Sequence, residues 1–175
     1  AQSGTNRVMT SPDGETWTSA SSTEANAWYS VTYGNGLFVA VSWNGTNRVM
    51  TSPDGITWTA QSAAEANQWL SVTYGNGLFV AVANTGTNRV MTSPDGETWT
   101  HRTAAEANSW YSVTYGNGRF VAVSWDGTSQ VMTSEDGETW TSASSTEANA
   151  WRSVTFGNGR FVAVSSDGTN RVMTS

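Results

Sequence analysis

A 41-residue unit is repeated four times along this chain without an insertion or a deletion. The segment at residues 4–11 recurs, with small changes, from glycines at positions 45, 86, 127 and 168. A repeat period of about 20–50 residues is typical of arrays, in which each unit packs against its neighbours. Any site inside the unit should occur about four times, whereas a catalytic site needs different residues that converge once. The repeat therefore predicts an array and disfavours an enzyme.

The repeat defines one domain of residues 1–175, with units at residues 4–44, 45–85, 86–126 and 127–167 and a partial unit at residues 168–175. In the first unit, Ser, Pro, Asp and Gly at residues 11–14 have the order that a type I turn favours. In the fourth unit Glu135 replaces the proline, which such a turn does not require. Gly-Asn-Gly at residues 34–36 predicts a hairpin, because both residues of an Asn-Gly turn tolerate positive φ. Each unit thus contains two tight turns at fixed positions.

Short runs of β-forming residues lie between these turns. We name the predicted strands A (residues 28–33), B (37–42), C (48–52) and D (57–60). Four antiparallel strands in about 40–45 residues form a propeller blade, whereas a β-solenoid would use shorter, parallel coils. The predicted fold class is therefore all-β: a β-propeller of four-stranded antiparallel blades, with about four blades per chain and a circularly permuted strand order.

The strand count leaves one C strand in excess. The chain begins with strands C and D, continues through three A–D sets and ends with A, B and C, which gives 17 strands where four blades need 16. Residues 5–11 and 169–175 compete for one position. Either the N-terminal D strand completes the blade that begins at Trp151 and closes a four-bladed ring, or two chains share blades in a larger homo-oligomeric ring. Both arrangements would cover sheet edges that could otherwise pair with other chains.

Residues 19–27 connect strand D to strand A, and this connection varies more than the strands do. Ser21 and Glu24 have the spacing of a capping box, in which Ser or Thr and a Glu three residues later satisfy free amides at a helix start. The spacing recurs at Ser62 and Glu65, Thr103 and Glu106, and Ser144 and Glu147. The pattern predicts a short helical turn and assigns the glutamates a structural rather than a cation-binding function.

Composition excludes several classes of partner and cofactor. The net charge is −6 and there is no lysine, so the clustered positive charge that neutralises nucleic-acid phosphates is missing. The longest apolar runs fall far short of the roughly 20 residues of a membrane span. Because there is no cysteine, disulfides, thiolate metal sites and cysteine nucleophiles are excluded. We expect no cofactor and no metal, and the compartment is undetermined, although an extracellular location is compatible with the sequence.

One short motif carries a resemblance to a known family. Residues 11–17, Ser-Pro-Asp-Gly-Glu-Thr-Trp, resemble the Asp-box (BNR, sialidase-type) repeat, whose pattern is Ser-x-Asp-x-Gly-x-Thr-Trp; here one residue fewer separates Asp from Gly. The motif recurs at residues 52–58, 93–99 and 134–140. The resemblance implies a hairpin between the third and fourth strands of a propeller blade, with a structural role remote from ligands.

The resemblance also raises the distant alternative of a sialidase-like hydrolase, in which three arginines would converge on a carboxylate. The repeated arginines at positions 7, 48, 89 and 171 belong to strand C, and Gln130 takes their place in the fourth unit. A Ser–His–Asp triad would need a histidine held by a carboxylate. The only histidine, His101, lies in the variable connection and has no counterpart in the other units. No catalytic residues are predicted, and the protein is not expected to be an enzyme.

The residues that break the repeat are the candidate ligand-binding residues. Most tryptophans recur in every unit and are predicted to pack between blades. Trp43 and Trp125 occur in only two units, in the connection between strands B and C, where an exposed indole could stack on a sugar. The candidate binding residues are Trp43, Asn44, Trp125, Asp126, Tyr29 and Tyr111. The D–A and B–C connections should emerge on the same face of a propeller.

These observations predict a non-catalytic, symmetric β-propeller that serves as a scaffold or binding module, either engineered or recently duplicated. The alternative is a secreted, multivalent glycan-binding lectin that uses the face of the D–A and B–C connections, where several weak sites would add avidity. The expected partners are a second copy of the chain and carbohydrate. Nucleic acid and membranes are not expected.

Overall fold

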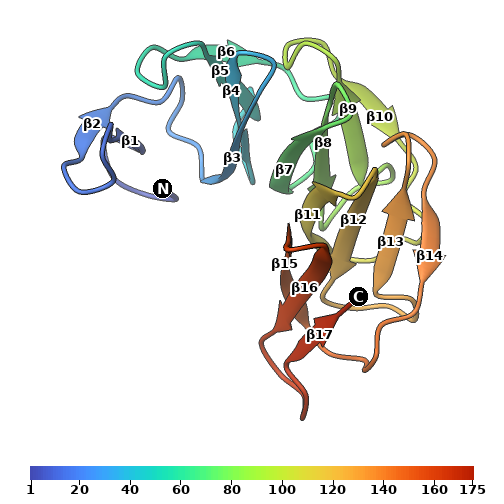
Figure 1. Ribbon diagram of the computed structural model, residues 1–175. Helices are drawn as coiled ribbons and strands as arrows, with labels where there is room; N and C mark the ends of the chain where they lie inside the picture. The colour runs from blue at the N-terminus through green and yellow to red at the C-terminus, as the bar shows by residue number, and fades with distance from the viewer.

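The computed structural model describes residues 1–175 and contains 17 β-strands, as the sequence predicted, and no helix. The strands form five antiparallel sheets that follow one another along an open arc (Figure 1). The N-terminal sheet has two strands, three complete blades have four each, and the C-terminal sheet has three. The chain thus begins with strands C and D and ends with A, B and C, as predicted.

The strand bounds are as follows: the N-terminal sheet, β1 (Val8–Thr10) and β2 (Thr18–Ala20); the first blade, β3 (Trp28–Gly34), β4 (Leu37–Ser42), β5 (Val49–Ser52) and β6 (Thr59–Gln61); the second blade, β7 (Trp69–Gly75), β8 (Leu78–Ala83), β9 (Val90–Ser93) and β10 (Thr100–Arg102); the third blade, β11 (Trp110–Gly116), β12 (Arg119–Ser124), β13 (Val131–Ser134) and β14 (Thr141–Ala143); and the C-terminal sheet, β15 (Trp151–Gly157), β16 (Arg160–Ser165) and β17 (Val172–Thr174).

Local turn chemistry sets the register of each blade. At the A–B hairpin Asn35 and Gly36 have φ values of 49° and 76°, the left-handed conformation predicted for the Asn-Gly turn. The hairpin pairs Val31 with Ala40, and Ala40 pairs in turn with Met50 on β5. A bulge at the start of each A strand shifts the register between the first Trp and the following Ser. Each blade is therefore a meander whose A strand lies on the inner edge of the arc and whose D strand lies on the outer edge (Figure 1).

The C–D hairpin is held by side chains of the Ser-x-Asp-Gly segment. The Asp54 carboxylate accepts bonds from the backbone amides of Ile56 and Thr57, both at 2.8 Å, and from the Ser52 hydroxyl at 2.9 Å. The Ser52 hydroxyl in turn accepts the Gly55 amide at 2.8 Å. The fourth copy keeps these bonds although Glu135 replaces proline, which confirms that the turn does not depend on proline.

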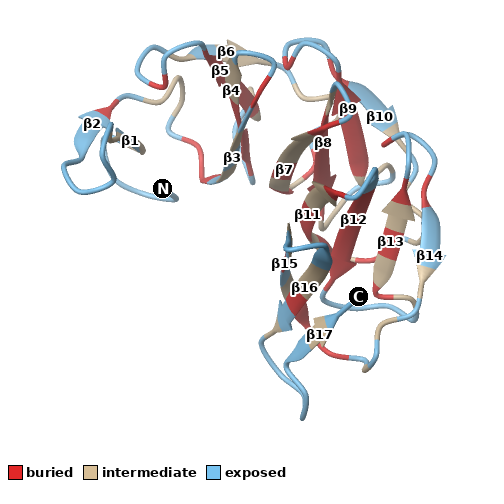
Figure 2. Cartoon of the chain, in the orientation of Figure 1, coloured by how far each residue is buried: buried red, intermediate tan, exposed pale blue.

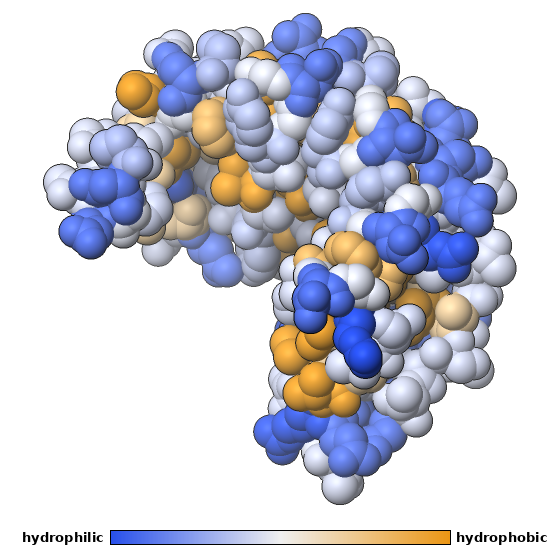
Figure 3. All heavy atoms as spheres, viewed as in Figure 1, coloured by the Kyte–Doolittle hydropathy of each residue, from blue (hydrophilic) through white to orange (hydrophobic).

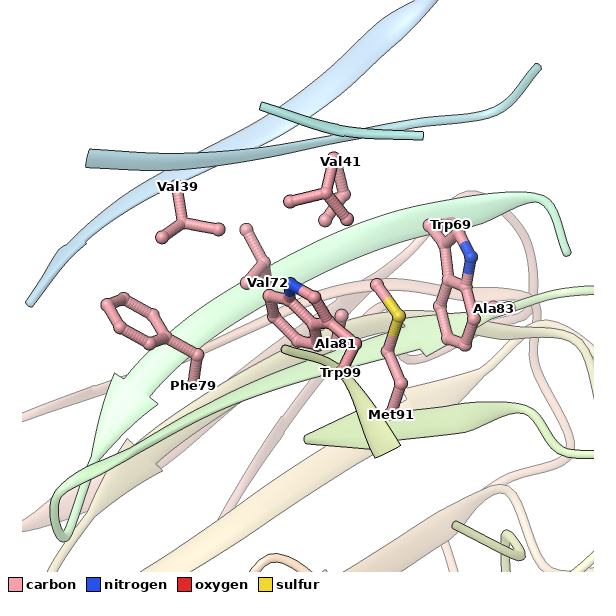
Figure 4. Packing of buried hydrophobic residues seen from close by; sticks show 10 residues of the cluster. Val39, Val41, Trp69, Val72, Phe79, Ala81, Ala83, Met91 and Trp99 are labelled. Carbon is pink, nitrogen blue, oxygen red and sulfur yellow. The ribbon is translucent and has the colours of Figure 1, made fainter. Parts of the chain in front are cut away.

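The hydrophobic core lies between successive blades. Val39 and Val41 of the first blade form one packed cluster with Trp69, Met91 and Trp99 of the second, and Figure 4 shows these side chains pointing toward one another across the two sheets. The corresponding cluster joins the second and third blades. Burial is therefore greatest in the middle of the arc and falls toward both ends (Figure 2). The repeated tryptophans are packing residues, as predicted, except Trp17 of the N-terminal sheet, which is exposed.

Two sequence expectations need correction or refinement. The D–A connections contain bends and no helical turn, so the predicted capping box is wrong. The chain also does not close on itself: β2 pairs only with β1, and β17 pairs only with β16, so the four-bladed closed ring is not the arrangement observed. The surplus C strand is present, since β1 and β17 are both copies of strand C.

Candidate functional site

The candidate site is one face of the arc, which we call the loop face. It comprises the D–A connections (residues 21–27, 62–68, 103–109 and 144–150) and the B–C connections (residues 43–48, 84–89, 125–130 and 166–171). The two kinds of connection touch: the Trp43 amide donates to the Ala27 carbonyl at 2.9 Å, and the equivalent bond joins Trp125 to Ser109 at 3.0 Å. This contact confirms that the D–A and B–C connections emerge together.

The repeated glutamates tie these two connections together. The Glu24 carboxylate accepts bonds from the Asn47 side chain at 2.6 Å, from the Asn47 and Thr46 amides at 3.2 Å each, and from the Asn26 side chain at 3.2 Å. Burial acts to raise the pKa of Glu24, but the bonds from Asn47, Asn26 and Thr46 outweigh it and hold the pKa below its ordinary value. The repeated carboxylate at this point therefore closes the B–C connection, where the sequence suggested a helix cap.

Asn44 and Asp126, both proposed as ligand-binding residues, hold the backbone of the same connections. The Asn44 carboxamide oxygen accepts the Ala27 amide at 2.8 Å. The Asp126 carboxylate accepts the Ser109 amide at 2.6 Å and the Ser109 hydroxyl at 2.8 Å. In the second unit the Thr85 hydroxyl does the same for the Gln68 amide at 3.1 Å. The Asn44 and Asp126 side chains thus fix the backbone of the connections that carry the exposed Trp43 and Trp125.

The repeated arginines are also engaged by the backbone. Arg48 donates to the carbonyls of Gly45 at 3.1 Å, Trp43 at 3.3 Å and Asn67 at 2.8 Å, and the last of these lies at the start of the next blade. Arg7 makes the equivalent bonds at the N-terminal sheet. Arg89 and Arg171 donate only to the glycine carbonyls of their own loops, Gly86 at 3.1 Å and Gly168 at 3.2 Å. Because each guanidinium is bonded to backbone carbonyls near its own connection, the arginines do not converge on a common point.

An aromatic cluster with one cation lies on the loop face between the third blade and the C-terminal sheet. The Tyr111 and Trp125 rings meet edge to face, with centroids 5.4 Å apart. The Arg152 guanidinium lies over both rings, 4.0 Å from the Trp125 centroid and 4.7 Å from the Tyr111 centroid. Trp125 is 45% exposed. Arg152 and the two rings therefore form a cation–π interaction at a partly exposed position.

Sequence reasoning named Trp125 and Tyr111 but missed Arg152. The signal was present, because Arg152 follows Tyr111 by one repeat length and residues at that separation are neighbours across two blades. The first blade has no counterpart to this cluster: Trp43 and Tyr29 are exposed, while the residue one repeat beyond Tyr29 is the buried Leu70. The two unit-specific tryptophans therefore have different surroundings.

No group of acidic residues and histidines is arranged to hold a metal ion. His101 lies exposed on β10, in pairing with Met91 of β9. The turn aspartates lie at the opposite end of the blades from the loop face, and hydrogen bonds from the Thr16 and Glu15 amides and the Ser11 hydroxyl lower the pKa of Asp13 to about 2. These carboxylates are ionised turn residues.

No helix in the chain has the length and apolar character that would be needed to cross a membrane.

The antiparallel blades, the 41-residue period and the arc of inner A strands define a protein of the β-propeller class. The chain belongs to the DUF6242 beta propeller domain family, whose model matches residues 1–107. No curated protein sequence matches the chain. The family membership accounts for the fold and leaves the ligand undefined.

Solved structures share the fold at low sequence identity. The virginiamycin B lyase from Staphylococcus aureus matches with a TM-score of 0.80 and 12% identity over 91% of this chain, which spans 56% of the lyase chain. The computationally designed Ika4 protein matches with a TM-score of 0.66 and 13% identity, over 87% of this chain and 92% of the other. YCF48 bound to D1 peptide matches with a TM-score of 0.64 and 18% identity, over 86% of this chain and 52% of the other. At these identities the similarity is one of fold alone.

Proposed function

We propose that this chain is a non-catalytic propeller scaffold whose loop face is a binding surface. The observation that carries the proposal is the engagement of the repeated polar groups by the fold. Glu24 and its copies, Asp13 and its copies, and Arg48 all bond to backbone or to neighbouring amides. The groups left for a ligand are those that differ between units, chiefly Trp43, Tyr29 and the paired rings of Trp125 and Tyr111.

A second candidate function, carbohydrate binding, is favoured by the two exposed indoles. Trp43 is 37% and Trp125 is 45% exposed, and each adjoins a side chain, Asn44 or Asp126, that fixes the loop carrying it. A flat aromatic surface on a rigid loop suits the apolar face of a sugar ring. Two or more weak sites on one molecule would act multivalently, as in a secreted lectin.

We also assign the Ser-x-Asp-Gly hairpins to the Asp-box (BNR) type, and we attribute the near-identity of the units to recent duplication or to engineering. The bond pattern of Ser52, Asp54 and Gly55 supports the first assignment, since the hairpin joins the third and fourth strands of its blade. The absence of any insertion over four units supports the second. A sialidase-like activity is not part of the proposal, because Arg7 and Arg48 are engaged by backbone carbonyls.

A glycan array tests the carbohydrate proposal. Binding that is lost in a Trp43→Ala, Trp125→Ala double variant and kept in an Ile56→Ala variant, which removes an exposed apolar side chain away from the loop face, would support it. If the unaltered chain binds no glycan on the array, carbohydrate is excluded as the ligand class. Turnover of a fluorogenic sialoside by the purified chain would overturn the proposal of a non-catalytic scaffold.

A further inference from the structure

One contact recurs at every junction between blades. The ring of Tyr74 lies against Gly34 so closely that a β-carbon at residue 34 would be 2.0 Å from Cγ of Tyr74. Tyr115 covers Gly75 and Phe156 covers Gly116 in the same way, each with 2.1 Å to the ring Cγ. The aromatic ring of the following blade thus packs against the glycine at the end of strand A, in the space that a side chain there would occupy.

A hydrogen bond accompanies this contact at the same three junctions. The Ser30 hydroxyl accepts the Val72 amide of the next blade at 3.2 Å. The pairs Ser71–Val113 and Ser112–Val154 repeat it at 3.1 Å. Neighbouring A strands are therefore joined by a fixed pair of contacts, one aromatic and one polar.

The two ends of the arc carry the two unfilled halves of this junction. Gly157 occupies the glycine position of the C-terminal sheet, and a β-carbon there would meet nothing within 4 Å. At the other end Tyr33, the aromatic partner position, is 58% exposed, and Val31 beside it is 59% exposed. Ser153, the equivalent of the accepting serine, is exposed as well. Figure 1 shows these ends on opposite sides of a gap.

An apolar groove lies at each end of the arc, where the strands of a further blade would pack. Between the N-terminal sheet and the first blade lies an open groove of about 500 Å³, lined by Val8, Met9, Trp28, Val31 and Phe38. It adjoins the side of β1 that has no partner strand, where strands A and B of a complete blade would lie. Figure 3 shows hydrophobic residues on both sides of the gap in the arc.

The second groove, of about 300 Å³, lies beside the C-terminal sheet and is lined in part by Val121, Val123 and Val131. Within the chain, Trp99 packs with Val39, Val41 and Val49 of the preceding blade, and Trp140 packs with Val80, Val82 and Val90. The three valines of the groove are the next set in this series. The tryptophan one repeat beyond Trp140 corresponds to Trp17, which is 53% exposed at the N-terminal end.

We propose that a second copy of this chain docks between these ends, so that two 175-residue chains close one ring. The C-terminal sheet of one copy supplies strands A and B to the N-terminal sheet of the other, Tyr33 of the other copy covers Gly157, and its Trp17 fills the groove beside Val121. Both junctions are alike, so the contacts are head-to-tail and the ring has two-fold symmetry. The docking uses the blade edges and not the loop face, and it is therefore independent of the proposed binding function.

The two copies of strand C decide how the shared blade is built. The N-terminal β1 is held to its own blade, because Arg7 donates to the Asn26 carbonyl at 2.7 Å and the terminal amine donates to the Arg7 carbonyl at 2.8 Å. The C-terminal β17 pairs with β16 alone, whereas β1 pairs with β2, the strand D that completes the shared blade. In the shared blade β1 of one copy therefore pairs with β16 of the other, and β17 is released.

The mass of the 175-residue chain in solution, measured by light scattering over a range of micromolar concentrations, tests the proposal. The expected value is twice the 18.7 kDa of one chain. The Gly157→Ala variant should raise the dissociation constant by about tenfold or more, because the added methyl takes the place of the Tyr33 ring without touching its own chain. Its far-ultraviolet circular dichroism should be unchanged. A monomer at all concentrations, an open polymer, or a Gly157→Ala dimer as tight as the unaltered one would each overturn the proposal.

A matched pair of variants tests the strand exchange. Met9 and Met173 occupy the same repeat position, on β1 and β17, and Met9 is 63% exposed in the single chain. Met9→Asp should abolish the dimer, because it places a carboxylate in the shared blade. Met173→Asp should leave the dimer intact, because β17 is displaced there. Loss of the dimer only with Met173→Asp would overturn the assignment of β1 to the shared blade.

Discussion

The carboxamide of Asn67 fills the space that a side chain at Gly86 would need: a β-carbon at residue 86 would lie 1.9 Å from Oδ1 of Asn67. Asn67 donates from this position to the Asn88 carbonyl and to the Glu65 carboxylate. The glycine that opens each repeat is therefore required by the loop face on two counts, since Gly86 also has a φ of +97°.

Replacing this glycine should destabilise the fold more than replacing a glycine in a hairpin. Gly77 has a comparable φ of +78°, but a β-carbon there would meet nothing within 4 Å. We expect Gly77→Ala to cost about 1–2 kcal/mol of unfolding free energy from backbone strain alone. Gly86→Ala should cost about 1–3 kcal/mol more, because Asn67 must also move. Urea unfolding of the two variants measures the difference, and equal midpoints would contradict the steric explanation.

The carboxylate of Glu65 should stabilise the fold more than an exposed carboxylate such as Glu97 does. It accepts the Asn88 side chain at 2.6 Å and the Asn67 side chain at 3.1 Å, and Asn67 is buried. Glu65→Ala leaves these donors without their acceptor, which should lower the free energy of unfolding by roughly 1–3 kcal/mol. Glu97→Ala, at an exposed turn position, should change it by less than about 0.5 kcal/mol. An equally small effect at both positions in thermal unfolding would show that the loop does not depend on the carboxylate.

The strands and hairpins could be predicted from the sequence because their signals are local. Asn35 and Gly36 specify a turn of known twist, and Ser52 and Asp54 specify another, so the strand order follows from chain direction. The structural role of Glu24 could not be predicted, because the Ser-to-Glu spacing of a capping box is also compatible with a glutamate that hydrogen-bonds a distant loop. Its partners, Thr46 and Asn47, lie more than 20 residues away in the sequence.

The shape of the arc and the aromatic cluster depend on contacts between blades. Whether the ends of the arc meet is set by the rotation from one blade to the next, which the packing of Tyr74 on Gly34 and its copies determines. No single unit carries that information. The repeat spacing places Arg152 beside Tyr111, but its stacking on Trp125 joins two units and is absent from the others, so a single unit does not reveal it.

The cores between blades should tolerate little loss of volume. Met132 is fully buried in one cluster with Trp110, Phe120 and Trp140. Met132→Ala leaves a cavity, and we expect a loss of about 2–5 kcal/mol in unfolding free energy. Ile56→Ala removes a side chain that is 61% exposed and should change the free energy by less than about 0.5 kcal/mol. Chemical denaturation of both variants gives the comparison, and a Met132→Ala midpoint close to that of Ile56→Ala would argue against a packed interblade core.

The turn aspartates should make the stability of the fold depend on acid pH. The amides of Thr139 and Glu138 and the Ser134 hydroxyl bond to the Asp136 carboxylate and lower its pKa to about 2, from an ordinary value of 3.8. Because the pKa is lower in the folded chain than in the unfolded chain, the stabilisation is complete above about pH 4 and is lost as the pH falls toward 2. Urea midpoints measured at pH 5 and pH 2 should therefore differ. In the Asp136→Asn variant the side-chain oxygen still accepts the two amides but does not titrate, so its midpoint should change less between these pH values. If both proteins lose stability equally, the acid sensitivity comes from other groups and not from this turn.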